Sequence, residues 1–288
     1  MTENAAIAGE PLIRCTRLGK VYYDSTQNSA VAALEDFSLE ITAGEFVTIL
    51  GPSGCGKSTL LNILAGFERA TSGEARLAGE VIDKPGPDRG VVFQEYALFP
   101  WLTVIENIMV GLKEKRQPRS ERDSIAQSYI AMAGLRGFEK KYPHELSGGM
   151  RQRVSLIRAL AIDPRILLMD EPFAAVDAQT RGVLQRELLK AWQSTGQTVL
   201  FITHNLEEAI FLGQRVVIMT ARPGRIKEII NVNLPYMRDP TTEAFNEFRR
   251  RASASIENEV SRAMGAEGQT GSWSARRVQQ VQKAKDHR

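Results

Sequence analysis

The chain has little of what marks several large classes of protein. It has only two cysteines in 288 residues, Cys15 and Cys55, too few for a disulfide framework or a four-cysteine metal site. Its apolar runs are short, as at 166–169 and 199–202, and none approaches the roughly 20 residues of a membrane span. We therefore do not expect the chain itself to form a channel.

A charge excess of one sign is also lacking. The formal net charge is +3, and residues 265–288 account for it, so residues 1–264 are formally neutral. Because residues 1–264 carry no excess of positive charge, nucleic acid is not an expected partner. The first residues lack the basic stretch and apolar core of a secretory signal, so we expect a cytoplasmic protein.

Short apolar segments rich in Val, Ile and Leu alternate with helical patterns, which predicts an α/β fold with a largely parallel sheet. Two earlier segments, 12–23 and 74–77, alternate in polarity and predict an antiparallel flank. The expected buried strands are 46–50, 90–93, 165–169, 198–203 and 215–219.

Between residues 95 and 162 the pattern becomes helical, at 105–112 and 124–133, which predicts an inserted helical subdomain. The expected domains are a discontinuous α/β core (1–93 and 163–234), a helical subdomain (94–162), a C-terminal helical extension (235–264) and a disordered tail (265–288).

The extension is expected to contain a helix over 241–264 with an apolar face opposite the basic residues 249–251. That face packs on its own chain or docks on a partner, and self-packing is the favoured alternative. Its apolar positions are Phe245, Phe248, Ala252, Ile256 and Val260.

A glycine-rich segment after the strand at 46–50 fits the phosphate-binding pattern G-x-x-x-x-G-K-[ST], in the strand–loop–helix context that this motif requires. Lys57 is expected to reach the β- and γ-phosphates of ATP, and the Ser58 hydroxyl to bind Mg²⁺. Cys55 occupies a free position of the motif and is expected to be a structural filler. The segment comprises Gly51, Pro52, Ser53, Gly54, Cys55, Gly56, Lys57, Ser58 and Thr59.

Two other predicted strands end in polar side chains suited to this chemistry. Asp170 ends one strand and is expected to hold Mg²⁺ through water, while Glu171 is expected to polarise the attacking water as a general base. His204 follows the strand at 198–203 and is expected to contact the γ-phosphate or orient the water. Carboxyl ends of parallel strands meet at one sheet edge, so these groups should converge.

The segment 146–153, Leu-Ser-Gly-Gly-Met-Arg-Gln-Arg, resembles, together with these motifs, the signature of ATP-binding cassette (ABC) ATPases. The resemblance implies a P-loop NTPase (RecA-like) core with an antiparallel flank and the helical insert. Ser147 can cap the following helix, and Gly148 and Gly149 let its first amides approach an anion. In this family the signature covers ATP held by the other chain, which implies a homodimer of cassettes with shared sites.

The same resemblance, which covers residues 12 to about 230, implies roles for three further positions. Tyr22 resembles the aromatic that stacks on adenine, although Tyr23 is a competing candidate. Gln94 resembles the glutamine that contacts Mg²⁺ and water and links hydrolysis to the transporter. Asp177 resembles the loop that crosses the dimer interface near the opposite site.

Finer similarity at 98–104, 178–181 and 219–226 resembles the ATPase subunits of nitrate, sulfonate and taurine importers. It implies peripheral attachment to the cytoplasmic face of the cell membrane, integral-membrane permease partners and, through their complex, a separate solute-binding protein. The sequence does not identify the solute, because specificity resides in the binding protein and the membrane subunits. The apolar side chains at 96 and 98–101 are expected to form the permease groove or to belong to the subdomain core.

Two other function classes compete with the importer ATPase. One is a soluble cassette ATPase acting on nucleic acid or ribosomes, for which the basic tail is the only feature in favour. The other is a nucleotide-binding subunit with negligible turnover, for which Glu171 is the discriminating residue.

Overall fold

The computed structural model describes residues 10–24, 29–115, 117–174 and 176–267. Its centre is a six-stranded sheet in the order β10-β9-β3-β8-β7-β6, parallel except for β10. The strands are β3 (Phe46–Leu50), β6 (Arg89–Val92), β7 (Ile166–Asp170), β8 (Thr198–Thr203), β9 (Arg215–Met219) and β10 (Ile226–Asn231).

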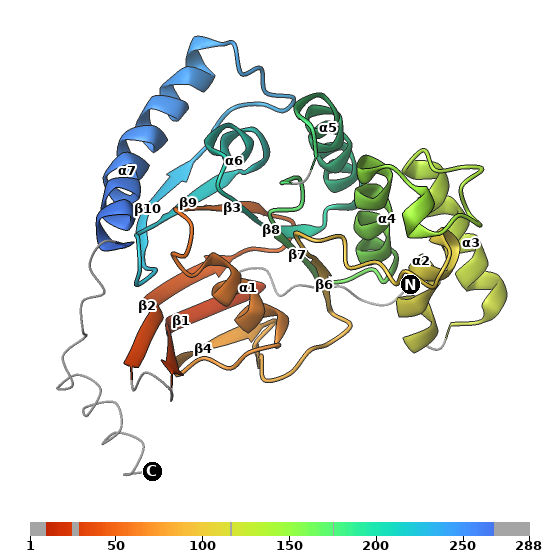
Figure 1. The fold of residues 1–288 in the computed structure, drawn as a ribbon, viewed down its shortest axis with the longest axis horizontal. Helices are drawn as coiled ribbons and strands as arrows, with labels where there is room; N and C mark the ends of the chain where they lie inside the picture. The colour runs from red at the N-terminus through yellow and green to blue at the C-terminus, as the bar shows by residue number, and fades with distance from the viewer. Residues whose placement is uncertain (1–9, 25–28, 116, 175, 268–288) are drawn as a thin grey trace, which may run out of the picture.

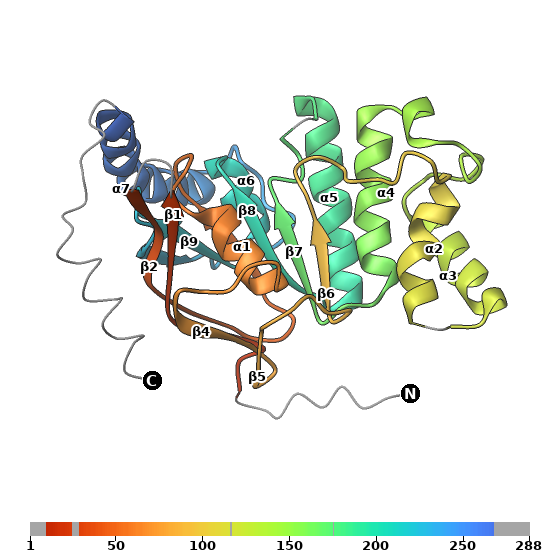
Figure 2. The same ribbon diagram turned by 60° about the horizontal axis from the view of Figure 1, so that its bottom comes forward.

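An antiparallel sheet of order β2-β1-β4-β5 lies beside this sheet (Figure 2). Helix α1 (Lys57–Ala65) lies between the two sheets and buries its leucines and isoleucine against both, so one apolar core joins them. The strands are β1 (Ile13–Asp24), β2 (Ser29–Ile41), β4 (Ser72–Leu77) and β5 (Glu80–Val81).

The opposite face of the six-stranded sheet is covered by α5 (Ala178–Thr195) and α6 (Leu206–Leu212). Figure 1 shows the helical subdomain at one end of the molecule and α7 (Glu243–Glu267) at the other. The subdomain has its own apolar core, built by α2 (Val104–Glu114), α3 (Arg119–Met132) and α4 (Gly148–Ala161), with the short helix η1 (Pro143–Glu145) before the signature.

Helix α7 starts and ends later than the predicted range 241–264. Asp239 accepts the amide of Thr241 at 2.9 Å, which closes a turn there, and the Thr242 hydroxyl accepts the amide of Phe245 at 3.3 Å. The helix continues to Glu267, into the predicted tail, whose remaining residues 268–288 lie outside the described residues.

The apolar face of α7 packs on its own chain. Phe245 and Ala252 are fully buried in the cluster that α5 and α6 share with the sheet, and Phe248 and Ile256 are partly buried against it. The side chain of Val260 lies outside the described part. Self-packing, the favoured alternative, is confirmed.

Arg238 fixes the segment that leads into α7. It is 5% exposed, and its guanidinium donates to carbonyls at the end of α6, including Ile210 and, at 2.6 Å, Gly213. It also donates to Val232 O at 3.1 Å. Burial lowers the pKa of Arg238, and the Tyr236 ring lies 4.3 Å from the guanidinium carbon. The carbonyls that α6 leaves unpaired at its end are therefore satisfied by a residue of the extension.

Among the described residues, no helix combines the length and the apolar character of a membrane span.

Candidate active site

The glycine-rich loop lies between β3 and α1, against β2. Gly54 and Gly56 have φ angles of 71° and 98°, in the left-handed region that favours glycine. A Cβ on Gly56 would lie 2.5 Å from the carbonyl oxygen of Ala33. The loop thus places the N-terminus of α1, the positive end of the helix dipole, at the edge of the sheet where the parallel strands have their carboxyl ends.

Lys57 is the first residue of α1 and is only 6% exposed. Its ammonium donates to the carbonyls of Gly51 and Pro52, both at 2.9 Å, and lies 4.0 Å from Cys55 Sγ. The cation is therefore held by the loop that it belongs to. Burial raises the pKa of the Cys55 thiol, which fits a structural filler better than a nucleophile.

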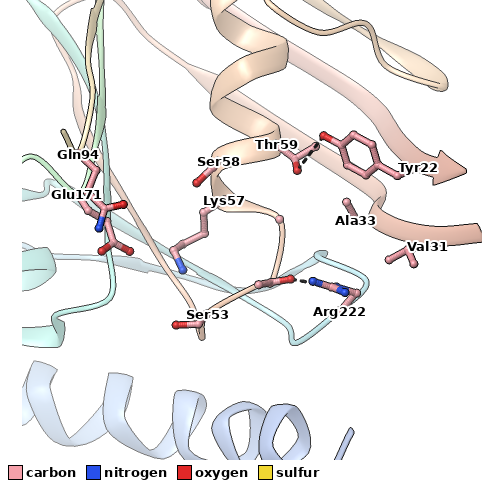
Figure 3. Close-up of a pocket in the computed structure, with 12 residues that line it drawn as sticks. Tyr22, Val31, Ala33, Ser53, Lys57, Ser58, Thr59, Gln94, Glu171 and Arg222 are labelled. Atoms are coloured by element: carbon pink, nitrogen blue, oxygen red, sulfur yellow. Dashed lines mark hydrogen bonds between the residues drawn. The ribbon is translucent and has the colours of Figure 1, made fainter. Parts of the chain in front are cut away.

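A pocket of about 490 Å³ opens in front of the loop (Figure 3). Nine of the residues predicted for the site line it: Tyr22, Ser53, Gly54, Gly56, Lys57, Ser58, Thr59, Gln94 and Glu171. Three further loop residues, Gly51, Pro52 and Cys55, are buried behind it.

Asp170 ends β7 next to Ser58. Burial is the main cause that raises the pKa of Asp170, and the neighbouring charge of Glu171 raises it further. A hydrogen bond from Ser58 and the charge of Lys57 oppose this increase. A hydroxyl and a carboxylate oxygen are thus brought together beside the pocket.

This pair suits a hard cation. Mg²⁺ prefers oxygen ligands, keeps waters and typically takes one or two protein groups together with phosphate oxygens. Within the described residues, no group of three or more His, Cys, Asp or Glu side chains is arranged so that it could hold a metal ion by itself. Ser58 and Asp170, with the Gln94 amide oxygen at the pocket wall, therefore fit a cation shared with a phosphate ligand better than an all-protein metal cage.

Glu171 and His204 face each other across the ends of β7 and β8. His204 Nδ1 lies 2.7 Å from Glu171 Oε2, and the Glu171 amide donates to Ile202 O at 3.0 Å. Glu171 has a φ of 43°, which is unusual outside glycine, so its neighbours hold it in a costly conformation. Its side chain is 18% exposed, compared with 60% for His204. Glu171 thus lines the pocket, whereas His204 does not line it and reaches the site only through its contact with Glu171.

A buried network holds the backbone on both sides of His204. The Thr203 hydroxyl donates to Glu208, whose other oxygen accepts Gln185 Nε2 at 2.9 Å. Asn205 caps α6 by accepting the Glu208 amide at 3.0 Å. Burial raises the pKa of Glu208. The position of His204 thus depends on α5 and α6 as well as on its own strand.

Tyr22 and Tyr23 point to opposite faces of β1, and only Tyr22 lines the pocket. The Tyr22 hydroxyl donates to Glu68 Oε2 at 2.7 Å and lies 3.4 Å from Thr59 Oγ1. Of the two tyrosines, Tyr22 is therefore placed to contact a ligand.

The signature residues do not line this pocket. Ser147 caps α4 by accepting the Met150 amide at 3.3 Å, and a Cβ on Gly149 would lie 2.9 Å from Thr180. Asp177 caps α5 in the same way through the Thr180 amide, which holds its pKa low. Ser147, Gly148, Gly149 and Asp177 thus sit at neighbouring helix starts, apart from the P-loop.

The structure adds Val31, Ala33 and Arg222 to the pocket lining. Val31 and Ala33 come from β2, which the sequence pattern did not predict. Arg222 lies just beyond β9 at the same edge as the other site residues, so its place after a predicted strand was a usable signal.

The predicted partner surface is only partly exposed. Trp101 is 69% exposed and lies 5.7 Å from the Phe99 ring, while Arg158 packs over that ring. Leu98 instead packs against the subdomain core. Of this stretch, Trp101 and its neighbour Pro100 are therefore the accessible part.

Comparison with known proteins gives a consistent family. Residues 34–174 match the family model of the ABC transporter. The chain is 53% identical over 234 residues to an uncharacterized ABC transporter ATP-binding protein of Methanocaldococcus jannaschii, covering 81% of this chain and 88% of that one. It is 48% identical over 235 residues to the aliphatic sulfonates import ATP-binding protein SsuB of Bacillus cereus, covering 82% and 92%.

Solved structures of an ATP-binding cassette, MJ0796, are also similar. Its dimeric structure matches with a TM-score of 0.69 at 33% identity, over 77% of this chain and 100% of that one. A dimeric post-hydrolysis state bound to ADP and Pi matches with a TM-score of 0.68 at 33% identity, with the same coverage.

Proposed function

The chain belongs to the ABC transporter family of ATP-binding proteins, and from this premise we propose that it powers import of a small sulfonate-like solute. As a member of the family it is an ABC-type ATPase, a cassette that binds ATP and works as a dimer with membrane permease subunits. The import direction, the solute and the role of each residue are the proposed parts.

One observation carries the hydrolytic role: four parallel strands end in polar groups at the same edge. β3 leads to Lys57, β6 to Gln94, β7 to Asp170 and Glu171, and β8 to His204. These are the groups that phosphoryl transfer to water requires, namely a cation for the phosphates, oxygen ligands for Mg²⁺ and a base.

In the proposed reaction, Lys57 leaves its loop carbonyls to contact the β- and γ-phosphates, because phosphate oxygens are stronger acceptors for an ammonium. Ser58, Asp170 and Gln94 would hold Mg²⁺, whose charge would offset that of the phosphates. Glu171 takes a proton from the attacking water as the water oxygen bonds to the γ-phosphorus, the bond to the bridging oxygen breaks and ADP leaves. His204 holds the Glu171 carboxylate in place through the 2.7 Å contact.

The proposed site is completed by a second chain. Ser147, Gly148 and Gly149 begin α4 outside the pocket, so they are free to cover the nucleotide of the partner cassette. Asp177 lies close to them, because it accepts the amide of Thr180 and Thr180 in turn approaches Gly149. We propose that it crosses the same interface.

Several features support the importer assignment. The SsuB relatives in Bacillus are named for sulfonate import, and they cover most of this chain. The exposed Trp101 and Pro100 offer a permease helix an apolar contact next to the segment that carries Gln94. A solute-binding protein and the cytoplasmic face of the membrane follow as the proposed partner and location.

The decisive experiment is reconstitution of the chain in liposomes with its permease and solute-binding protein. We expect ATP hydrolysis to rise when an alkanesulfonate-loaded binding protein is added, with taurine and nitrate as competing solutes. The Glu171→Gln chain supplies the inactive control. Stimulation by nitrate alone would reject the sulfonate assignment, and stimulation by nucleic acid without the permease would favour the soluble ATPase class.

A further inference from the structure

The turn between β9 and β10, residues 220–225, closes one end of the pocket. The Thr220 amide donates to Arg225 O at 2.9 Å, and the Thr220 hydroxyl donates to Pro223 O at 2.8 Å. The Arg225 amide donates back to the Thr220 hydroxyl at 3.0 Å. The β9–β10 turn is therefore closed by hydrogen bonds among its own residues.

This turn packs closely on the phosphate-binding loop and on β2. The Gly224 amide donates to Ala33 O at 2.9 Å, and the Glu35 amide donates to Gly224 O at 3.1 Å. A Cβ on Gly224 would lie 2.1 Å from Cys55 O, so only glycine permits this approach. A displacement of the turn would consequently reach the pocket.

Arg222 projects from the turn into the pocket. Its Nε donates to Gly54 O at 3.2 Å, which uses one of the five N–H donors of a guanidinium. Figure 3 places Arg222 near the end lined by Val31 and Tyr22, whereas Glu171 lies at the other end. The positive charge is thus far from the hydrolytic groups and next to the expected base and ribose end.

Helix α7 holds the same turn from its other side. The Ala221 amide donates to Glu259 Oε2 at 2.9 Å, and Lys227 Nζ lies 2.9 Å from Glu259 Oε1. Lys227 also donates to Ser255 O at 2.7 Å. Glu259 is 1% exposed, so this carboxylate is a buried link between α7 and the residue before Arg222.

We propose that Arg222 is a nucleotide-binding residue, and that α7 positions it through Glu259. The guanidinium can exchange its hydrogen bond to the Gly54 carbonyl for one to a phosphate oxygen, because hydrogen bonds between two charged groups are stronger. At the Tyr22 end, it would contact the part of the nucleotide that ATP and ADP share. The inference rests on the proposed nucleotide pocket but is independent of the solute.

The first test replaces Arg222 by Met in the full chain and measures the Kd of ATP and ADP by titration. The affinity for each nucleotide should fall about tenfold. This is the low end of the range for a hydrogen bond to a charged group, because Arg222 is exposed. The loss should shrink at high salt, which screens an exposed charge. Arg222→Lys should recover part of it. The matched control is Arg225→Met, which removes the same charge from the same turn but whose partner is Glu35.

The second test replaces Glu259 by Gln, which keeps the side-chain shape but can satisfy only one of Ala221 and Lys227 with its oxygen. Nucleotide affinity should fall about threefold, a loss of one buried hydrogen bond. The Arg222→Met, Glu259→Gln double variant should bind as Arg222→Met does, because Glu259 acts through Arg222. The control is Glu257→Gln, on the same helix but exposed.

Unchanged affinity in Arg222→Met, or an equal loss in Arg225→Met, would overturn the binding role. Additive losses in the double variant would overturn the link through α7. If Glu259→Gln melts near the assay temperature, Glu259→Asp replaces it with the same expectation. A wild-type chain that binds no nucleotide would reject the pocket assignment too, whereas failed sulfonate stimulation with intact binding would reject only the importer proposal.

Discussion

Asp170 and Glu171 are neighbours in the chain but have different surroundings. Asp170 is half-buried beside Ser58, and burial raises its pKa. Glu171 lines the pocket and is held by His204 at 2.7 Å. Two adjacent carboxylates can thus serve different purposes, with one suited to a cation and the other to a water molecule.

Replacing Glu171 with Gln should abolish turnover while ATP binding remains. The amide keeps the size of the carboxylate but cannot accept the proton of water, so phosphate release should fall about 10²–10⁴-fold. Nucleotide-bound dimers should accumulate, measured by light scattering with ATP. Glu207→Gln, an exposed change on α6, is the control. Unchanged turnover in Glu171→Gln would reject its role as the base.

Replacing Asp170 with Asn should raise the Tm of the nucleotide-free chain at neutral pH. A folded-state pKa above the unfolded value means that folding favours the protonated carboxyl, so its ionisation at neutral pH costs stability. The gain over wild type should vanish as the pH falls through the raised pKa.

Asp177→Asn is the control of opposite sign. The Thr180 amide lowers the pKa of Asp177, so its ionised form stabilises the fold above the unfolded pKa, and that contribution is lost as pH falls through the folded pKa. Its substitution should never raise the Tm at neutral pH. A lower Tm in Asp170→Asn would contradict the burial argument.

Local patterns predicted the site residues that one motif or one strand end specifies, such as Lys57 and Glu171. They did not single out Arg222, although its place just after the predicted strand 215–219 was a usable signal. They could not predict Glu259, because nothing near it in the sequence distinguishes it from the other charged residues of its helix. Glu259 is buried only because α7 returns to the β9–β10 turn, far away in sequence.

Among the elements, the buried parallel strands were the most predictable. β8 and β9 have the predicted bounds, since continuous apolar runs buried on both faces leave little choice. β2 was missed because its alternation of polar and apolar residues is interrupted. Asp36 has a φ of 50°, and the pairing of β2 with β1 shifts register three times.

The packing of α7 predicts that Phe245 contributes strongly to stability. Phe245→Ala should lower the free energy of unfolding by about 3–5 kcal/mol, because it removes a fully buried ring and leaves a cavity. Phe248→Ala, on the same helix and partly buried, should cost clearly less. Urea unfolding of the full chain measures both. Equal effects would contradict the assigned packing.

At the scale of the whole molecule, the proposed site is divided between two places. The phosphate-binding loop lines the pocket, and the signature begins α4 elsewhere. One chain therefore holds two incomplete halves, and a pair related by twofold symmetry would form two complete sites.

Mixing two inactive variants tests this division. Lys57→Ala should weaken nucleotide binding, and Ser147→Arg should block closure of the dimer by crowding the second phosphate surface. A mixed dimer has one doubly defective site and one intact site, so ATPase activity should return on mixing if one site suffices for turnover. Full activity of Ser147→Arg by itself would reject the shared site.

Arg238 is synthesised after every segment that its guanidinium holds. While a ribosome is still making the extension, the α6 carbonyls of Ile210 and Gly213 lack their partner, although the phosphate-binding loop and β3 have already emerged. Chains fold by domains as they are made, so the cassette should gain its final rigidity only when the C-terminal segment docks. We therefore expect a chain that ends before Arg238 to carry the nucleotide motifs and yet be cut by proteases more readily than the full chain.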